Sequence, residues 1–131
     1  MAAQIIPTDD TPGAREARVI YFIDRALATF ATGERAGFVE GLKQLQKKAR
    51  KVGKGRRFSE LSAEQQITVL KKIETSQFFE LVRTMTILGM FSDPGYGGNY
   101  NKIGWKMIGF EDQFFFNAPF GSYDRDYKAK E

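Results

Sequence analysis

The sequence contains no cysteine and no histidine among its 131 residues. Without cysteine the chain cannot form a disulfide, bind zinc through thiolates, or hold an iron–sulfur cluster or a cysteine-attached haem. Without histidine it lacks the side chain that most often moves protons and ligates metals near neutral pH. We therefore expect no catalytic residue, no metal site and no cofactor on this chain.

Long apolar runs are also missing, and none approaches the ~20 residues that cross a bilayer. Residues 1–11 have neither the basic start nor the apolar core of an export signal. The pair Arg56-Arg57 lies in mid-chain before a polar segment, so it does not fit a twin-arginine signal. We expect neither a transmembrane segment nor an export signal in this sequence.

What the chain does have is apolar and aromatic content typical of a globular domain. Hydrophobic residues make up 42% of it, and its twelve phenylalanines are more than a disordered linker would carry. The length suits a single domain over residues 1–131. We divide it into an N-terminal arm (1–10), a helical core (11–110) and an extended tail (111–131).

The first half of the core predicts two helices. Thr11 is the expected N-cap of the first, which places Pro12 at the first helical position and extends to about residue 32. Its buried stripe is expected to be Val19, Ile20, Ile23, Leu27 and Phe30. The second covers about 34–52, ends at the glycines of 53–55, and repeats Phe38, Leu42, Leu45, Ala49 and Val52. We expect the two to form a helical hairpin.

Two more helices follow. Ser62 and Gln65 have the spacing of a capping box, which predicts a helix over 63–74 with Ile67, Leu70 and Ile73 inward. Thr75 or Ser76 is expected to cap the next helix, which reaches about residue 89. Its buried side would hold Phe78, Phe79, Val82, Met85 and Thr86. No strand-like alternation is found, so the predicted fold is all-α, a small bundle of about four helices.

Residues 91–110, FSDPGYGGNYNKIGWKMIGF, contain five glycines, one proline and five aromatic residues. Glycines permit tight turns and close backbone approach, which predicts a shaped loop. Asn99 is expected to cap a short helix that holds Ile103, Trp105 and Met107. The glycines do not have the spacing of a phosphate-binding loop and no strand precedes them, so nucleotide binding is not expected.

Four segments carry a family resemblance: IIPTDDTPGAREA, RRFSELSAEQQ, FFELVRT and MFSDPGYGGNYNKIGWKMIGF. Across residues 5–110 the chain resembles the gluconate 2-dehydrogenase subunit 3 family. The resemblance implies a non-catalytic helical subunit bound to a large FAD-containing flavoprotein of the glucose-methanol-choline (GMC) type, often with a multihaem cytochrome c as third component. It also implies that the small subunit assists folding of the flavoprotein and carries it to the periplasm through a twin-arginine signal. Because this sequence shows no such signal, a cytoplasmic location is the alternative.

We predict a partner-binding surface on the glycine-rich segment and the tail. Asp93, Tyr96, Asn99 and Tyr100 are expected to face the partner, while Trp105 is equally suited to the core and to the interface. The tail aromatics are too many for a small domain to cover, so we expect at least some of them to contact the large subunit, with folding back over the hairpin as the alternative. They are Phe114, Phe115, Phe116 and Phe120.

The charged residues allow two other interpretations. Residues 43–57 hold eight basic side chains and no acid, which favours a solvated helix face or contact with an acidic partner over nucleic-acid binding. Asp93, Glu111 and Asp112 are near one another in sequence, but acids beside proline and glycine more often cap turns than catalyse. A free-standing chaperone or carrier and a nucleic-acid adaptor remain the alternatives to an accessory subunit.

Overall fold

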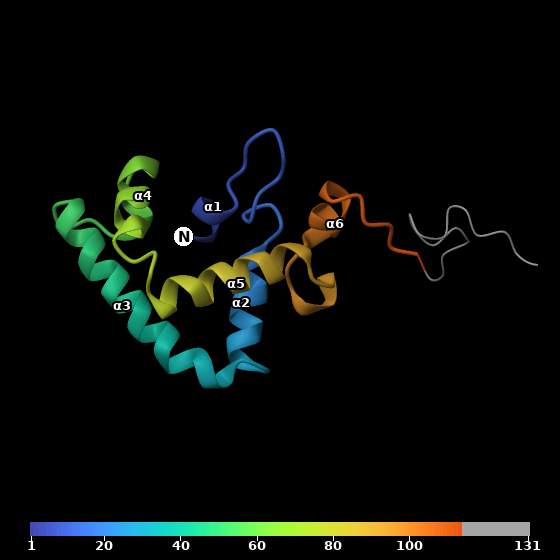
Figure 1. The fold of residues 1–131 in the computed structure, drawn as a ribbon, viewed down its shortest axis with the longest axis horizontal. Helices are drawn as coiled ribbons and strands as arrows, with labels where there is room; N and C mark the ends of the chain where they lie inside the picture. Colours follow the sequence, from blue (N-terminus) through green and yellow to red (C-terminus); the bar gives the residue numbers. More distant parts are fainter. Residues whose placement is uncertain (114–131) are drawn as a thin grey trace, which may run out of the picture.

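The computed structural model describes residues 1–113, and over them the chain is helical without a strand (Figure 1). This confirms the predicted all-α class; the tail aromatics predicted to bind a partner lie outside the described residues. The α-helices are α1 (Ala2–Ile5), α2 (Val19–Ala28), α3 (Arg35–Val52), α4 (Ala63–Lys71), α5 (Gln77–Phe91) and α6 (Ile103–Met107). Short 3₁₀ turns join them: η1 (Thr32–Glu34), η2 (Phe58–Glu60), η3 (Pro94–Tyr96) and η4 (Tyr100–Lys102).

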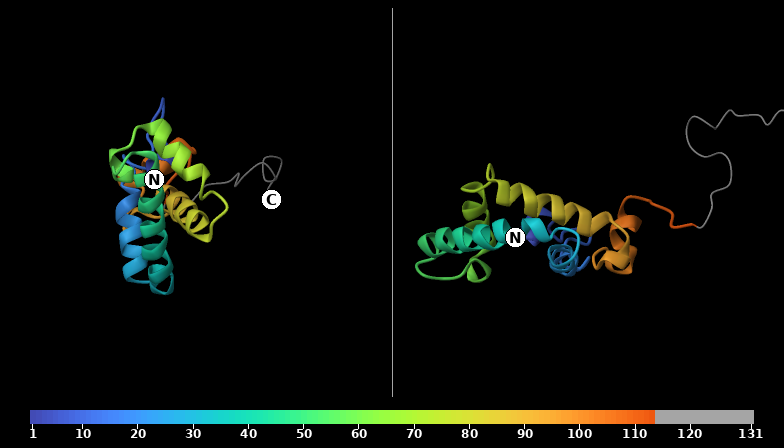
Figure 2. Two further views of the ribbon diagram at one scale, coloured as in Figure 1. Left: turned by 90° about the vertical axis from the view of Figure 1, so that its left-hand side faces the viewer. Right: turned by 90° about the horizontal axis from the view of Figure 1, so that it is seen from below.

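The core consists of two hydrophobic clusters that share α5. One cluster is built mainly on α2 and the second half of α5, where Met85 and Met90 are buried. The other is built on α3, η2 and α4, and Phe78 and Phe79 from the start of α5 pack against it. Because α5 runs along the long axis of the molecule, it joins the two clusters (Figures 1 and 2).

The predicted hairpin of the first two long helices is wrong. In Figure 1, α2 and α3 meet at their linked ends near η1 and diverge like the sides of a V. Helix α2 packs on α5 instead, where Gly89 permits close approach: a Cβ there would lie 3.0 Å from Cγ1 of Val19. Helix α3 packs mainly on α4. Gly89 therefore permits the close packing of α2 on α5.

Helix α2 also begins later than predicted, because Thr11 is not its N-cap. The Thr11 N–H and hydroxyl both donate to Asp9, which lowers the pKa of that carboxyl group. The carbonyl of Ala17 accepts from the backbone N–H of Tyr100, so it is not part of the hydrogen-bond pattern of an α-helix. Arg18 then adopts a left-handed conformation, φ 56°, and the helix begins at Val19. A hydrogen bond from a segment distant in the sequence thus interrupts the helix predicted from Thr11.

Several residues predicted as core are exposed. Ile20 and Phe30 are 65% and 62% exposed. Phe22 and Ala26 lie on the buried face of α2 instead. Phe30 lies beyond the end of α2, because that helix ends at Ala28. Leu42 and Ile67 were also predicted to be buried and are partly exposed, while Val69 is buried.

The local signals in the middle of the chain are confirmed. Helix α3 has nearly the predicted bounds, and Ser62 with Gln65 forms the capping box at the start of α4. Ser76 caps α5 by accepting from the backbone N–H of Phe79. Four residues of the predicted N-terminal arm form α1, which packs against α4 and α5.

Two glycines of α3 provide a matched test of this packing. A Cβ on Gly41 would lie 2.1 Å from the Phe78 ring, whereas a Cβ on Gly37 would meet no atom within 4 Å. We expect Gly41→Ala to lower the free energy of unfolding by about 1–3 kcal/mol through overpacking. Gly37→Ala is expected to raise it by up to about 1 kcal/mol, since alanine favours the helix. Urea unfolding measures both, and equal gains would refute the packing of α3 against α5.

Candidate partner-binding surface

The glycine-rich loop lies directly on the end of α5. A Cβ on Gly98 would be 2.0 Å from the carbonyl oxygen of Gly89, and one on Gly104 would be 1.9 Å from that of Met90. The backbone N–H of Asn99 donates to Gly89 at 2.7 Å. Such distances leave no room for a side chain, so the glycines are required for this contact. The prediction of a shaped loop is confirmed.

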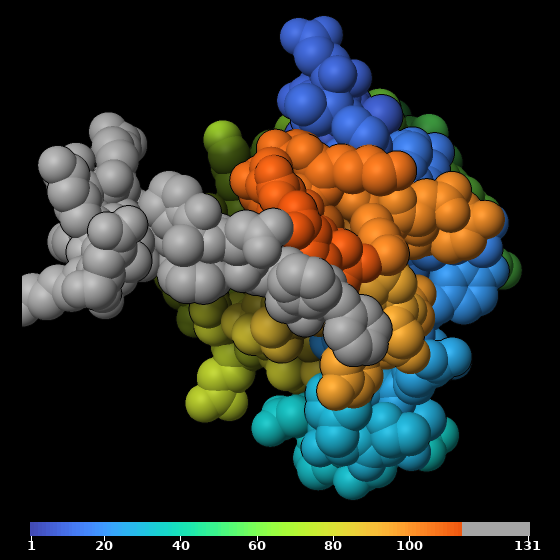
Figure 3. Space-filling view, turned by 90° about the vertical axis from the view of Figure 1, so that its right-hand side faces the viewer, coloured from blue at the N-terminus to red at the C-terminus, as the bar shows by residue number. Residues whose placement is uncertain are grey.

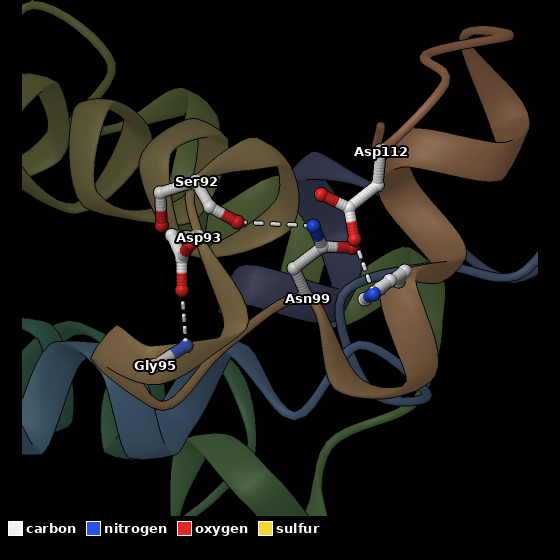
Figure 4. A network of polar contacts seen from close by, with 6 residues as sticks. Ser92, Asp93, Gly95, Asn99 and Asp112 are labelled. Carbon is white, nitrogen blue, oxygen red and sulfur yellow. Dashed lines mark hydrogen bonds and ion pairs between the residues drawn. The ribbon is translucent and has the colours of Figure 1, made fainter. Parts of the chain in front are cut away.

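Asn99 holds the loop from the inside. Its side chain is fully buried; its amide nitrogen donates to the carbonyl of Ser92 at 2.9 Å (Figure 4), and its amide oxygen accepts from the N–H of Gly104 at 2.8 Å. The N-cap position of α6 is Lys102, so the prediction that Asn99 is the cap of this helix is wrong, although its side chain does bind an N–H of the first turn. The expectation that Asn99 faces a partner is wrong, because its polar groups are used within the chain.

Trp105 joins α6 to the last turn of α5. Its indole N–H donates to the carbonyl of Phe91 at 2.6 Å, and its ring lies 4.9 Å from that of Phe110. The core role weighed for Trp105 is therefore present. Its side chain is only half-buried, and contact with a partner stays a prediction.

The acids of this region stabilise turns. Asp93 accepts from the backbone N–H of Gly95 at 2.7 Å, and Asp112 pairs with Lys102 (Figure 4). Asp93 is exposed, so its carboxylate remains accessible. Within residues 1–113 no three acidic side chains gather as a possible metal site. The acids near this loop thus act as caps and ion-pair partners.

Tyr96 and Tyr100 project from the docked loop, at 53% and 41% exposure. Tyr96 contacts the ring of Phe30 edge-on, with centroids 6.2 Å apart, and Phe30 in turn contacts buried Phe22. Figure 3 shows the loop and α6, in orange, bordering the blue surface of α2. Tyr21 of α2 is exposed and adjoins the loop, since a Cβ on Gly97 would lie 3.2 Å from its carbonyl group. Together these side chains form what we call the α2–loop surface: Tyr21, Phe30, Tyr96 and Tyr100.

Two arginines fix the loop onto α2. The Arg25 guanidinium donates to the carbonyl of Gly95, next to Tyr96. The Arg18 guanidinium lies 3.5 Å from the ring centre of Tyr100, a cation–π contact. Arginine and tyrosine are the side chains that dominate binding at protein interfaces, and here they are held in place before any partner arrives.

Ile20, Tyr21 and Phe30 were missed as surface residues by the sequence prediction. One signal was available, since residues 19–23 are five consecutive apolar or aromatic side chains. A helix buries only one face against the core, so a run of this length must leave some of them outside.

Among models of known protein families, the one described as gluconate 2-dehydrogenase subunit 3 matches residues 1–112. The chain belongs to the gluconate 2-dehydrogenase subunit 3 family. Comparison with curated proteins and with solved structures found no match. Membership of this family makes the chain a subunit of a dehydrogenase complex. In the described part of this subunit, no helix is both long and apolar enough to cross a membrane.

Proposed function

We propose that this subunit is the non-catalytic small subunit of an FAD-dependent, GMC-type dehydrogenase acting on a sugar, sugar acid or glycoside. The observation that carries the proposal is the α2–loop surface, where aromatic side chains remain exposed on a loop that Arg18 and Arg25 hold against α2. Such a surface is typical of the centre of a protein–protein interface.

The chemistry of the complex belongs to the partner in this proposal. The chain has neither imidazole nor thiol, and the acids of its loop are engaged in a turn and an ion pair. The large subunit would bind FAD, and this flavin would accept hydride from the substrate. A cytochrome c subunit would then accept electrons from the reduced flavin. By the family resemblance the complex would be periplasmic and exported with the small subunit.

The small subunit would act by mass action. A protein that binds only the folded flavoprotein stabilises it in proportion to the logarithm of its concentration over Kd. Because the glycine-rich loop is already docked on α2 and α5, little ordering is needed at binding, which favours tight association. The expected result is a flavoprotein that folds in higher yield and retains FAD longer.

The test is to express a GMC-type flavoprotein subunit from the same organism with and without this chain. In gel filtration we expect the chain to elute with protein that shows the visible absorption band of bound flavin. Without the chain, the melting temperature of the flavoprotein is expected to fall. Elution of the chain alone, with the flavoprotein unchanged in yield and melting temperature, would refute the proposal. If the melting temperature rises with the chain but the two elute apart after maturation, the carrier alternative replaces it.

A further inference from the structure

Helix α3 has a second face that its neighbours leave uncovered. Leu45 and Ala49 are buried toward α4, while Val39 and Leu42 point away and remain 44% and 38% exposed. Along this side the helix presents an open surface. It is formed only by residues of α3, which we call the outer face: Val39, Leu42, Lys43, Gln46, Lys47, Arg50 and Lys51.

The outer face carries an excess of positive charge. Helix α3 contains six basic side chains and a single acid, Glu40. Within residues 1–113 the one ion pair of this helix joins Lys43 to Glu40, at 3.8 Å. Lys47, Arg50 and Lys51 have no acidic partner in that part of the chain, and all three are exposed.

Apolar and basic groups are separated along the helix axis. Val39 and Leu42 lie toward its first half, and Lys47, Arg50 and Lys51 toward its last turns. A partner surface with an apolar residue beside several carboxylates would cover the apolar and the basic part of the outer face at once. It would also place its carboxylates against the basic side chains of α3.

Two other classes of partner fit less well. Helices that lie in a membrane interface insert a broad apolar face, but the broad apolar face of α3 is already packed against α4 and α5. Single-stranded nucleic acid is bound by aromatic side chains between the charges, and the outer face has none. Duplex binding would leave Val39 and Leu42 against a charged phosphate backbone.

We infer that the outer face of α3 is a second docking site, which binds a carboxylate-rich protein surface with an apolar side chain seated on Val39 and Leu42. Resting on the proposed function, we assign that acidic surface to the flavoprotein subunit. The α2–loop surface would supply most of the binding energy. The outer face would attract the partner and set its orientation, so its charges govern the association rate.

The experiment compares charge-reversed variants on an immobilised flavoprotein subunit. Lys47→Glu combined with Arg50→Glu is expected to slow association about tenfold at low salt and to reduce its salt dependence. The control, Lys71→Glu with Lys72→Glu, changes net charge equally at exposed positions outside the outer face and should alter the rate less than twofold. Lys47→Gln with Arg50→Gln gives a milder form if the reversed variant does not fold, as judged by circular dichroism.

Each outcome is decisive. Equal slowing by both pairs would show an effect of net charge alone and overturn the inference, as would no slowing by either. The charge-reversed variants could instead lose binding to phosphatidylglycerol vesicles or duplex DNA while binding the flavoprotein normally. That result would show that the outer face binds a membrane or nucleic acid, and the inference would be wrong. If the unaltered chain fails to bind the flavoprotein, the proposed function fails first. If it binds and only the α3 variants are without effect, the proposed function stands and the inference alone is wrong.

Discussion

Replacement of Asn99 by alanine is expected to lower the free energy of unfolding by about 3 kcal/mol. The change removes a part-buried hydrogen bond to Ser92 and a buried one from Gly104, and leaves the N–H of Gly104 buried without an acceptor. An unsatisfied buried donor costs more than the bond it made, because it has lost water as well. Urea unfolding followed by circular dichroism at 222 nm, the usual band of α-helix, measures the loss.

Asn101 is the matched control for this prediction. Both asparagines have left-handed backbone angles, with φ 46° at Asn99 and 56° at Asn101, but Asn101 is exposed. Asn101→Ala therefore loses only the tolerance of asparagine for that conformation, and we expect a change of less than about 1 kcal/mol. Equal losses at the two positions would show that backbone strain, and not the buried amide, holds the loop.

The second large effect is expected at the contact between Phe30 and Tyr96. Alanine at either position should weaken binding to the flavoprotein about tenfold or more, since exposed aromatics at the centre of an interface each contribute roughly 2 kcal/mol. Neither change should alter the helical content, because both side chains are more than half exposed. Titration calorimetry with the purified flavoprotein measures the affinity.

Leu88 provides the control for this surface, as an exposed apolar residue of α5 that is not among the α2–loop residues. Leu88→Ala should leave the affinity unchanged within about twofold. The double variant at Phe30 and Tyr96 should lose less than the sum of the single changes, since the two rings support each other. Unchanged affinity in both single variants would remove the α2–loop surface from the interface.

Some of the candidate site could be predicted from the sequence, because part of it depends on short-range rules. Tyr96 and Asp93 were placed on an exposed turn, as the Asp-Pro-Gly order indicates, and the structure agrees. The inward orientation of Asn99 could not be predicted. The side chain of an asparagine in a glycine-rich loop can point inward to bind backbone groups or outward to solvent equally well. Only the proximity of Ser92 and Gly104 decides its direction.

The sequence by itself determined the helical class, the bounds of α3 and the caps at Ser62 and Ser76, because periodicity and capping act within a few residues. The tertiary structure alone decided that α2 begins at Val19, that it packs on α5 and not on α3, and that Phe30 is exposed beside Tyr96. The physical reason is that these features depend on contacts between distant segments. The Tyr100 N–H takes the carbonyl of Ala17, and the missing side chain of Gly89 leaves space for α2.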